Sequence, residues 1–440
     1  MMTELLDALA EEALAVARPQ RFGRVTQMVG MSIEVAGIPA AIGDGLLLLA
    51  GEDQLHAEVV AIRADRVVCL AFGNPVGIRV GTRVIALGGP LPVRVGQRLM
   101  GRILDGFGRP IDDGPLVQGF DVSVAGVPPH PLRRGIVNEQ LPLGVRVIDG
   151  LIPCGKGQRL GIFAGSGVGK SSLMSMIARG TSADVTVVAL IGERGREVAE
   201  FIERDLGEKG LKRSIVVVAT SDAPAVMRIR AAFTATRIAE WFRDQGNDVL
   251  LMMDSLTRFA MAQREVGLAA GEPPATRGYP PSVFGLLPRL LERAGMAETG
   301  SITGLYTVLV EGDDMNEPIA DTARSILDGH IQLSRALAES NHYPAVDVLG
   351  SISRVAPAVA SKEQLDAGGV VRELLAAWRD AKDLIEIDAY VAGTNPVVDH
   401  AVRLKPRIDA FCKQGIAEIS NIEVTKDALA ALVLPGEAGQ

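Results

Sequence analysis

Three glycines and a lysine lie close together in the segment AGSGVGKSS, residues 164–172. Glycines at this spacing let the backbone point consecutive N–H groups at one centre, which favours a bound phosphate. Lys170 adds an ammonium for the terminal phosphates, and Ser171 adds an oxygen ligand for Mg²⁺. The segment matches the phosphate-binding loop pattern except that Ala164 replaces its first glycine. The candidate nucleotide-binding residues here are Ala164, Gly165, Ser166, Gly167, Val168, Gly169, Lys170, Ser171 and Ser172.

The sequence on either side of the loop predicts the elements that must position it. GIFA before the glycines is typical of a strand, and KSSLMSMIARG after them is typical of a helix. The helix N-terminus would turn its positive dipole end toward the phosphate. Ala164 is tolerable if its backbone keeps ordinary dihedral angles. This context makes a chance glycine-rich turn a poor alternative, so the sequence predicts nucleotide binding.

Asp254 ends a second apolar run, VLLMMD. Parallel sheets present ligand groups at the carboxyl ends of their strands, so an acidic residue there suits the magnesium shell. The alternative is a structural one, because aspartate is also a good N-cap and the helical pattern SLTRFAMAQRE follows directly. The two roles are compatible, and we favour the metal role.

Glu193 follows the apolar run VTVVALIG, so we expect it at the same edge of the sheet. Nucleotide hydrolysis needs a group that orients the attacking water, and a carboxylate can do this. The alternative for Glu193 is a surface ion pair with Arg194 or Arg196. Spacing alone leaves both interpretations open.

From about residue 159 the chain alternates apolar runs with helical segments such as residues 224–245. Continuous apolar strands with helical crossovers predict a parallel sheet covered on both faces. The class is therefore α/β. The expected strands are RLGIFA, VTVVALIG, SIVVVAT, DVLLMMD and GLYTVLV.

The two ends of the chain differ from this central pattern. Residues 22–95 carry short β-branched stretches separated by turn residues, which predicts a small antiparallel barrel or sandwich. After about residue 360 the pattern is mostly helical. Residues 4–17 predict an amphipathic helix, which either packs on its own domain or docks a partner.

Several long segments together resemble one family. PLGVRVIDGLIPCGKGQRLGIFAGSGVGKSSLM, GERGREV, DSLTRFAMAQRE and HYPAVDVLGSISRV are similar to the ATPases of the rotary ATP synthases and type III secretion systems. GEPPATRGYPPSVFGLLPRLLERAG and EGDDMNEPIAD are most similar to the flagellar export ATPases within that family. The resemblance is strong over residues 95–440 and looser over the barrel region.

The resemblance implies a RecA-like P-loop ATPase core with a parallel sheet, an N-terminal small β-barrel and a C-terminal helical domain. The expected parts are an amphipathic helix at 1–20, a β-barrel at 21–95, the RecA-like domain at 96–358 and a helical domain at 359–440.

The resemblance also implies roles for single residues around Mg²⁺-ATP. Lys170 and Arg194 lie near the transferred phosphate, and Asp254 lies behind magnesium. Glu193 matches the glutamate that polarises the attacking water, a position at which non-catalytic paralogues carry another residue. The family therefore implies hydrolysis rather than binding alone.

Two further residues are implied by the same resemblance. Tyr343, in HYPAVD, matches the aromatic residue that stacks on adenine, and its alternative is a core tyrosine. Arg354, in SISRV, matches the arginine finger inserted into the neighbouring subunit's site, and its alternative is a local salt bridge. A finger supplied by a neighbour makes a single chain nearly inactive.

The family implies an ATP hydrolase that drives flagellar type III protein export as a homohexamer. It also implies partners: a stator-like regulatory protein at the N-terminal helix, a central stalk-like export protein, and chaperone–cargo complexes at the C-terminal end. A peripheral contact with the membrane export gate would place the ring at the inner face of the cytoplasmic membrane. The expectation of an intracellular protein agrees with the lack of a signal peptide pattern or of an apolar run of about 20 residues.

Other functions remain open at this point. An injectisome export ATPase would use the same chemistry, and a catalytic subunit of a rotary ATP synthase would need a paired paralogue. A Rho-like nucleic-acid translocase is disfavoured, since the net charge is −8 and only 4% of the residues are aromatic. No nucleic-acid partner is therefore expected. Glu193 argues against a nucleotide-binding assembly subunit without turnover.

Overall fold

The computed structural model describes residues 22–433 apart from 52, 116, 311 and 313. The helix expected at residues 4–17 lies outside the described residues. The chain divides into two compact units. The first ends at Leu91 and includes Pro224–Val226 and Val266–Glu272, and the second contains the rest.

The first unit is a closed antiparallel barrel with the strand order β1-β2-β5-β4-β3-β6. Alternating apolar residues point inward, as in β2, where Ile33 and Val35 are fully buried. Pairing between β1 and β6 closes the barrel, so the barrel prediction is confirmed and the sandwich alternative is wrong. The strands are β1 Phe22–Val29, β2 Ser32–Ala36, β3 Gly45–Ala50, β4 Asp53–Arg63, β5 Arg66–Ala71 and β6 Arg83–Ala86.

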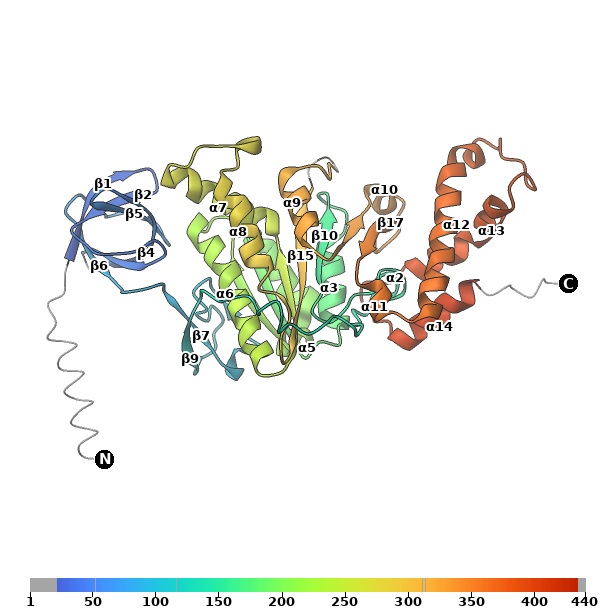
Figure 1. Cartoon of the computed structure of the whole chain (residues 1–440), viewed down its shortest axis with the longest axis horizontal. Helices are drawn as coiled ribbons and strands as arrows, with labels where there is room; N and C mark the ends of the chain where they lie inside the picture. The colour runs from blue at the N-terminus through green and yellow to red at the C-terminus, as the bar shows by residue number, and fades with distance from the viewer. Residues whose placement is uncertain (1–21, 52, 116, 311, 313, 434–440) are drawn as a thin grey trace, which may run out of the picture. The chain divides into compact units, whose positions relative to one another are not determined.

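The second unit is built on a nine-stranded sheet with the order β17-β16-β10-β15-β13-β11-β12-β8, and β14 pairs with β15 (Figure 1). The pairs from β16 to β8 are parallel, whereas β17 and β14 are antiparallel additions. The strands are β8 Ile103–Leu104, β10 Arg159–Ala164, β11 Val185–Ile191, β12 Ser214–Ala219, β13 Asp248–Asp254, β14 Gly295–Met296, β15 Ser301–Leu309, β16 Gly329–Leu333 and β17 Val346–Ser353. A separate two-stranded ribbon pairs β7 Pro92–Val95 with β9 Phe120–Ser123.

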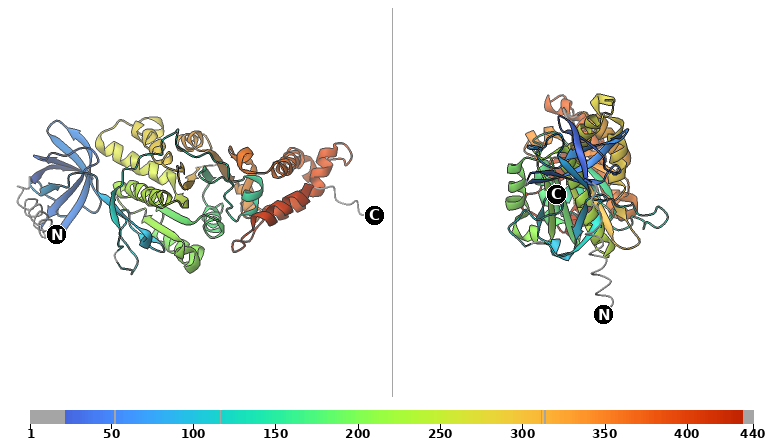
Figure 2. Two further views of the ribbon diagram at one scale, coloured as in Figure 1. Left: turned by 60° about the horizontal axis from the view of Figure 1, so that its bottom comes forward. Right: turned by 90° about the vertical axis from the view of Figure 1, so that its left-hand side faces the viewer.

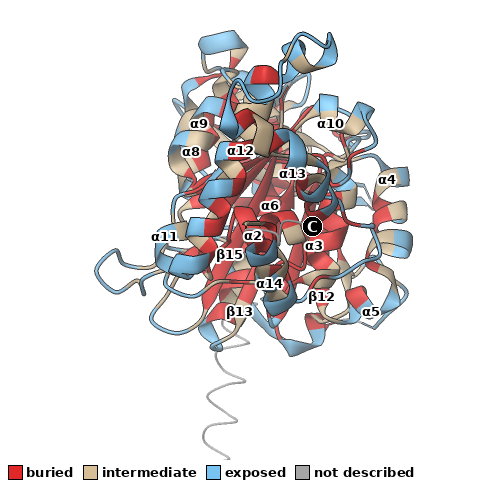
Figure 3. Cartoon of the chain, turned by 90° about the vertical axis from the view of Figure 1, so that its right-hand side faces the viewer, coloured by how far each residue is buried: buried red, intermediate tan, exposed pale blue. Residues whose placement is uncertain are grey.

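Helices cover both faces of this sheet, as unbroken apolar strands require. Alternate residues of β11 face opposite ways, so Val187 joins the core under α6–α9 and Val188 joins the core under α3. The central strands β11 and β12 are accordingly buried along their whole length, while the covering helices expose their outer faces (Figure 3). The covering elements are α2 Arg146–Leu151, α3 Lys170–Gly180, α4 Gly195–Glu200, η2 Phe201–Leu206, α5 Gly207–Lys212, α6 Ala225–Asp244, α7 Leu256–Ala270, α8 Pro281–Leu291 and α9 Pro318–Ile326.

The chain ends in a helical group that packs on α2 and β17 (Figure 2). Its long helices are α12 Lys362–Glu386, α13 Pro396–Cys412 and α14 Ile422–Val433. The remaining short helices are η1 Gln97–Leu99, η3 Thr276–Gly278, α10 Arg335–Glu339 and α11 Ala356–Val359. None of the helices in the described part of the chain has the length and apolarity needed to cross a membrane.

The expected fold class is confirmed, and β10 and β13 have the bounds that the sequence predicts. The main difference is β15, which begins at Ser301 rather than Gly304. The polar residues at its start are buried because they find partners: Ser301 Oγ donates to Asp248 Oδ1 at 2.7 Å, and Thr303 Oγ1 accepts from the Gly157 amide at 2.8 Å. Buried hydroxyls that are satisfied in this way do not end a strand.

Candidate active site

The glycine loop connects the end of β10 to the start of α3. Gly167 and Gly169 have φ angles of 79° and 93°, which other residues adopt only with strain. Ala164 is the last residue of β10 and pairs with Leu309 of β15, so its backbone is ordinary strand. This conformation explains why alanine can replace the first glycine of the pattern.

A cavity of about 970 Å³ lies beside the loop and reaches the ends of β11 and β15. Most of the loop residues line it, and the positive end of α3 faces the same space. The charged side chains of its lining are Lys170, Arg194, Arg258, Arg264, Arg277 and Arg335, against the carboxylates of Glu193, Glu197 and Glu317. Six cations against three carboxylates give the electropositive surroundings that a polyphosphate needs.

The sheet edge brings the lysine and both predicted carboxylates together. Lys170 Nζ donates to Asp254 Oδ1 and lies 3.5 Å from Glu193 Oε1. Thr307 Oγ1, from β15, donates to the same Asp254 oxygen at 2.7 Å. Residues from three neighbouring strands and the glycine loop therefore meet at one point, as the position of these residues in the sequence predicts.

The surface ion pair considered for Glu193 does not form. Arg194 pairs with Glu197 at 3.0 Å, and Arg196 pairs with Glu200 at 2.7 Å. Both arginine side chains are largely exposed, whereas that of Glu193 is mostly buried beside Lys170. The geometry thus leaves Glu193 directed at the loop.

The N-cap alternative for Asp254 also fails, because the neighbouring residue takes that position. Ser255 Oγ accepts from the backbone amide of Arg258 at 3.2 Å, at the start of α7. The carboxylate of Asp254 is instead held by Lys170 and Thr307.

The carboxyl group of Glu193 has unusual electrostatics. Burial, and then the charge of Asp254, raise its pKa to about 7, while Lys170 acts in the opposite direction. Its Oε1 atom is buried and accepts no hydrogen bond from the described residues, although it forms the 3.5 Å ion pair with Lys170. A buried acceptor of this kind is suited to a hydrogen bond from a ligand or a water.

Three oxygen-bearing side chains fit the predicted magnesium site. Ser171, Glu193 and Asp254 line a cavity of about 80 Å³ next to the larger one. Hydroxyl and carboxylate oxygens suit Mg²⁺, which takes most of its other ligands from phosphate and water. Residues 22–433, apart from the four gaps, contain no cluster of three or more His, Cys, Asp or Glu side chains placed to hold a metal ion.

Tyr343 lies against the glycine loop. A Cβ atom on Gly169 would come within 3.3 Å of the tyrosine ring. The side chain is 42% exposed, so it is not the core tyrosine of the alternative interpretation. Its ring is thus available to a ligand beside the loop, although Tyr343 is absent from the lining of the 970 Å³ cavity.

Arg354 lies just after β17 and is exposed. Its Nη2 approaches only the carbonyl of Arg324, at 3.5 Å. Among the residues that the structure describes, no carboxylate lies within 4.0 Å of its guanidinium, so the local salt bridge is not formed. Arg354 does not line the cavity of its own chain, which agrees with a role at a neighbour's site.

The sequence did not single out Arg258 or Arg264, which line the cavity from α7. Arg258 Nε is buried without a hydrogen-bond partner. The available signal was the three-residue spacing of Arg258, Met261 and Arg264, which places them along one face of the helix. Arg277 and Arg335 also join the cavity, but they lie in the short helices η3 and α10, which are too short to give a periodic signal.

Three family models match the chain. Residues 144–353 match the nucleotide-binding domain of the ATP synthase alpha/beta family, and residues 23–88 match its beta-barrel domain. Residues 360–431 match the C-terminal domain of the type III secretion ATPase EscN. The matched regions follow the barrel, the sheet and the helical group.

Whole-chain relatives agree with these matches. The flagellum-specific ATP synthase of Bacillus subtilis is 53% identical over 417 residues, which is 94% of this chain and 95% of the relative. The type 3 secretion system ATPase of Xanthomonas euvesicatoria is 49% identical over 434 residues, 98% of each chain. The assembled ATPase EscN of enteropathogenic E. coli superposes with a TM-score of 0.88 at 47% identity, over 93% of this chain and 99% of EscN.

With these matches and the geometry of the glycine loop, the chain belongs to the ATP synthase alpha/beta family, among the flagellum-specific and type III secretion ATPases.

Proposed function

We propose that this protein is the Mg²⁺-ATP-hydrolysing motor of a flagellar type III protein export apparatus. The observation that carries the proposal is the buried carboxyl group of Glu193, whose Oε1 accepts no hydrogen bond from the described residues and lies 3.5 Å from Lys170 Nζ at the glycine loop. A nucleotide-binding subunit without turnover has no need for a carboxylate kept in this costly state.

The residues of the loop bind and orient the triphosphate. The amides of the glycine loop and the first turn of α3 hold the phosphate oxygens. Lys170 exchanges its bond to Asp254 for the β- and γ-phosphates when nucleotide enters, and Arg194 lies near the terminal group. Ser171 and Asp254 would hold magnesium, which would neutralise the charge that develops on the phosphates.

Glu193 orients the attacking water. When Lys170 turns to the phosphates it leaves its 3.5 Å ion pair with Glu193 Oε1, and that oxygen then accepts a hydrogen bond from the water. Because burial and Asp254 raise its pKa to about 7, the group is a stronger base than an ordinary glutamate. Tyr343 stacks on the adenine ring beside Gly169.

The active assembly in this proposal is a homohexamer in which Arg354 completes the site of the next subunit. Its exposure and its lack of a carboxylate partner in the described part of the chain support this role. An arginine finger spreads positive charge over the transferred phosphate and contributes about 10³–10⁵ in rate. The solved relative EscN is described as an assembled ATPase.

Flagellar duty is favoured by the 53% identity to the flagellum-specific relative of Bacillus subtilis. The second candidate is an injectisome export ATPase, favoured by the 49% identity to the type 3 secretion relative. Both perform the same chemistry and differ in their partners.

The proposed partners follow the same comparisons. A central stalk-like protein occupies the ring, as supported by the solved complex of EscN with its central stalk EscO. We also propose a regulatory partner at the amphipathic segment 4–17, chaperone–cargo complexes at the helical domain and a peripheral contact with a membrane gate. The proposed domain limits are 1–20, 21–95, 96–358 and 359–440.

The test is the steady-state ATPase rate of a Glu193→Gln variant, with Glu200→Gln as the matched control. Loss of the water-orienting carboxylate should lower kcat by about 10²–10⁴-fold while nucleotide binding is kept. Glu200 lies at the end of α4 and pairs with Arg196 at 2.7 Å, so its variant should retain most of the rate. Unchanged turnover in Glu193→Gln would remove Glu193 from the proposed role.

A further inference from the structure

One segment on the surface of the second unit exposes apolar side chains. Residues 124–137, which we call the strap, contain neither helix nor strand. Val127, Leu132 and Ile136 on the strap are 83%, 90% and 80% exposed. Apolar side chains that gather on one part of a surface mark interaction sites, whereas apolar residues scattered singly do not.

The strap is nevertheless firmly attached to the rest of the unit. Arg293, which is only 2% exposed, donates to the Val124 carbonyl at 3.0 Å. Arg134 donates to the carbonyls of Pro129 and Glu292, at 3.0 and 2.7 Å. Buried or partly buried arginines thus hold the backbone of the strap at two places. The apolar side chains are therefore exposed from a fixed backbone.

The end of the strap packs beside the segment that carries Arg354. A Cβ atom on Gly155 would come within 2.4 Å of Val137 and 3.0 Å of Val359. The same atom would come within 3.3 Å of Val355, the residue after the proposed finger. Three valines, one from the strap and two from the finger segment, therefore surround this glycine. The strap and Arg354 belong to one packed group.

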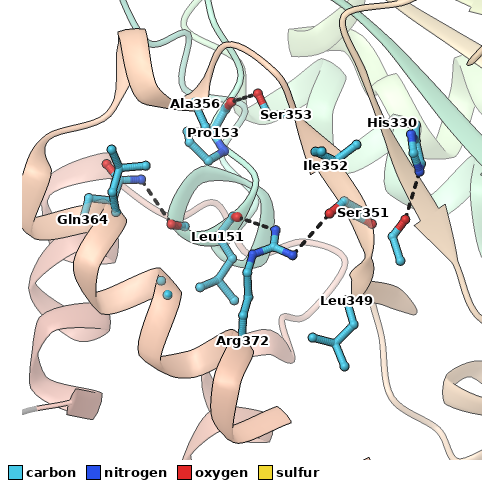
Figure 4. Close-up of a pocket in the computed structure, with 15 residues that line it drawn as sticks. Leu151, Pro153, His330, Leu349, Ser351, Ile352, Ser353, Ala356, Gln364 and Arg372 are labelled. Carbon is cyan, nitrogen blue, oxygen red and sulfur yellow. Dashed lines mark hydrogen bonds between the residues drawn. The ribbon is translucent and has the colours of Figure 1, made fainter. Parts of the chain in front are cut away.

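Arg354 and the glycine loop of the same chain lie at opposite ends of neighbouring strands. Ser353, directly before the finger, donates to the Pro153 carbonyl at 2.7 Å (Figure 4). The Arg354 amide donates to the Asp328 carbonyl at 3.0 Å, just before β16 begins. Strand β16 runs parallel to β10, and the glycine loop follows the far end of β10. Figure 3 also shows α11 and α4 on opposite sides of the sheet.

The face of a second copy that the finger would approach carries α4 and η2. Glu193 and Arg194 directly precede α4, so a group that reaches the transferred phosphate from another chain lies beside this helix. Residues 195–206 contain four carboxylates against two arginines. The strap contains two arginines and no carboxylate. The two segments are therefore complementary in charge, as the two sides of an interface tend to be.

One charged residue on each side is free to change partners. Glu203, on η2, is exposed and forms no ion pair or hydrogen bond with the described residues. Arg133, on the strap, lies 3.7 Å from Glu298, and both side chains are mostly exposed. Such a surface pair contributes little to stability, so Arg133 can leave it for another carboxylate at small cost.

We propose that the strap docks on α4 and η2 of a second copy of this chain, and that this contact places Arg354 beside that copy's glycine loop. Leu132 and Ile136 supply the apolar area, and Arg133 pairs with Glu203. The inference rests on the proposed function, in which Arg354 acts between copies. Each copy uses different faces for its two neighbours, so the contact is head-to-tail and can close a ring.

The first experiment links the two faces covalently. The full chain with Leu132→Cys and Glu203→Cys is treated with a short bis-maleimide, and the products are separated on a denaturing gel. The native cysteines are buried and should not react. We expect a ladder of dimers and larger products, because a head-to-tail contact links every copy to the next.

The control for this experiment pairs Leu132→Cys with Val391→Cys, whose position in the helical group is 69% exposed. It should give no ladder. No product from the Leu132→Cys and Glu203→Cys chain, or a product that stops at dimers, overturns the proposal. A ladder of equal yield from the control also overturns it.

The second experiment measures assembly by analytical ultracentrifugation. Leu132→Glu places a carboxylate against the acidic face, so the protein concentration needed for assembly should rise at least about tenfold. Val391→Glu is the matched control and should assemble like the wild type. Adding Glu203→Lys to Leu132→Glu should restore assembly, since the pair then attracts. Undiminished assembly of Leu132→Glu, or no restoration by Glu203→Lys, overturns the proposal.

These experiments measure assembly rather than turnover, so they are separate from the test of the finger. Mixtures of Arg354→Ala and Lys170→Ala chains test the shared site by its ATPase rate. A ladder without recovery of that rate supports the docking surface and contradicts the finger. Recovery of the rate without a ladder supports the finger and overturns the docking surface.

Discussion

At the scale of single residues, the most informative group is the carboxyl of Glu193. Burial and Asp254 favour its neutral form, so its folded pKa of about 7 lies above its ordinary value of 4.5. The same environment that makes it a good base makes it costly to keep charged. The raised pKa of Glu193 therefore favours its proposed role as a base but lowers the stability of the folded state once the group is charged.

The pH dependence of kcat/KM follows from this pKa. If Glu193 acts as a carboxylate, kcat/KM should fall as the pH drops through about 7. The folded state also binds more protons than the unfolded state between about pH 4.5 and 7, so Glu193 should reduce stability as the pH rises through that window. The melting temperature of Glu193→Gln minus that of the wild type should increase from pH 5 to pH 8. A constant difference would contradict the raised pKa.

The glycine loop gives a second residue-scale prediction. Gly169→Ala places a side chain at a φ of 93° and within 3.3 Å of the Tyr343 ring, so it should weaken ATP binding at least about tenfold. Ala164→Gly restores the strict loop pattern at a strand position and is the matched control. It should leave ATP affinity unchanged and lower stability by about 0.5–1 kcal/mol. Both effects can be measured by fluorescent-nucleotide titration and chemical denaturation, and equal affinities in the two variants would refute the argument.

At the scale of elements, the segment after α13 holds the tyrosine beside the loop. The backbone N–H of Gln414 donates to the Tyr343 carbonyl at 3.0 Å. The Gln414 side chain accepts from the Arg146 amide at 2.7 Å and donates to the Gly144 carbonyl at 2.8 Å. The buried residue Gln414 thus connects the helical group to the backbone of Tyr343.

We expect Gln414→Ala to raise the KM for ATP more than it lowers kcat, because it removes the side-chain bonds that hold the Gln414 backbone against Tyr343 while leaving Lys170 and Glu193 in place. Preference for ATP over CTP, whose smaller base stacks less well, should fall as well. Lys413→Ala is the matched control, since that side chain is exposed next to Gln414. An unchanged KM with a reduced kcat would contradict the positioning role.

At the scale of the whole molecule, the proposed finger acts only between copies. Arg354→Ala should bind ATP normally but lose turnover, because it supplies no arginine to its neighbour. Lys170→Ala should lose turnover because its own glycine loop lacks the lysine, although it still supplies Arg354 to a neighbour. In random mixtures of equal amounts, about a quarter of the interfaces pair an intact loop with an intact arginine. ATPase assays of the mixtures should therefore recover up to about a quarter of the wild-type rate per site. No recovery at any ratio would contradict a site shared between subunits.

The sequence by itself determined the fold class, the glycine loop and most of the strands that surround it. This was possible because these features are local: apolar runs set β10 and β13, and glycine spacing sets the loop. The family resemblance added the roles of Glu193, Asp254, Tyr343 and Arg354, which spacing alone left open.

Only the tertiary structure decided which partner each charged residue takes. In the folded chain, Glu193 forms its ion pair with Lys170 rather than with Arg194. The cap of α7 is the Ser255 side chain rather than that of Asp254. The end of the strap packs beside the segment that carries Arg354. These contacts link residues that are far apart in the chain or depend on which way a backbone turns, and hydrophobic periodicity carries no information about either.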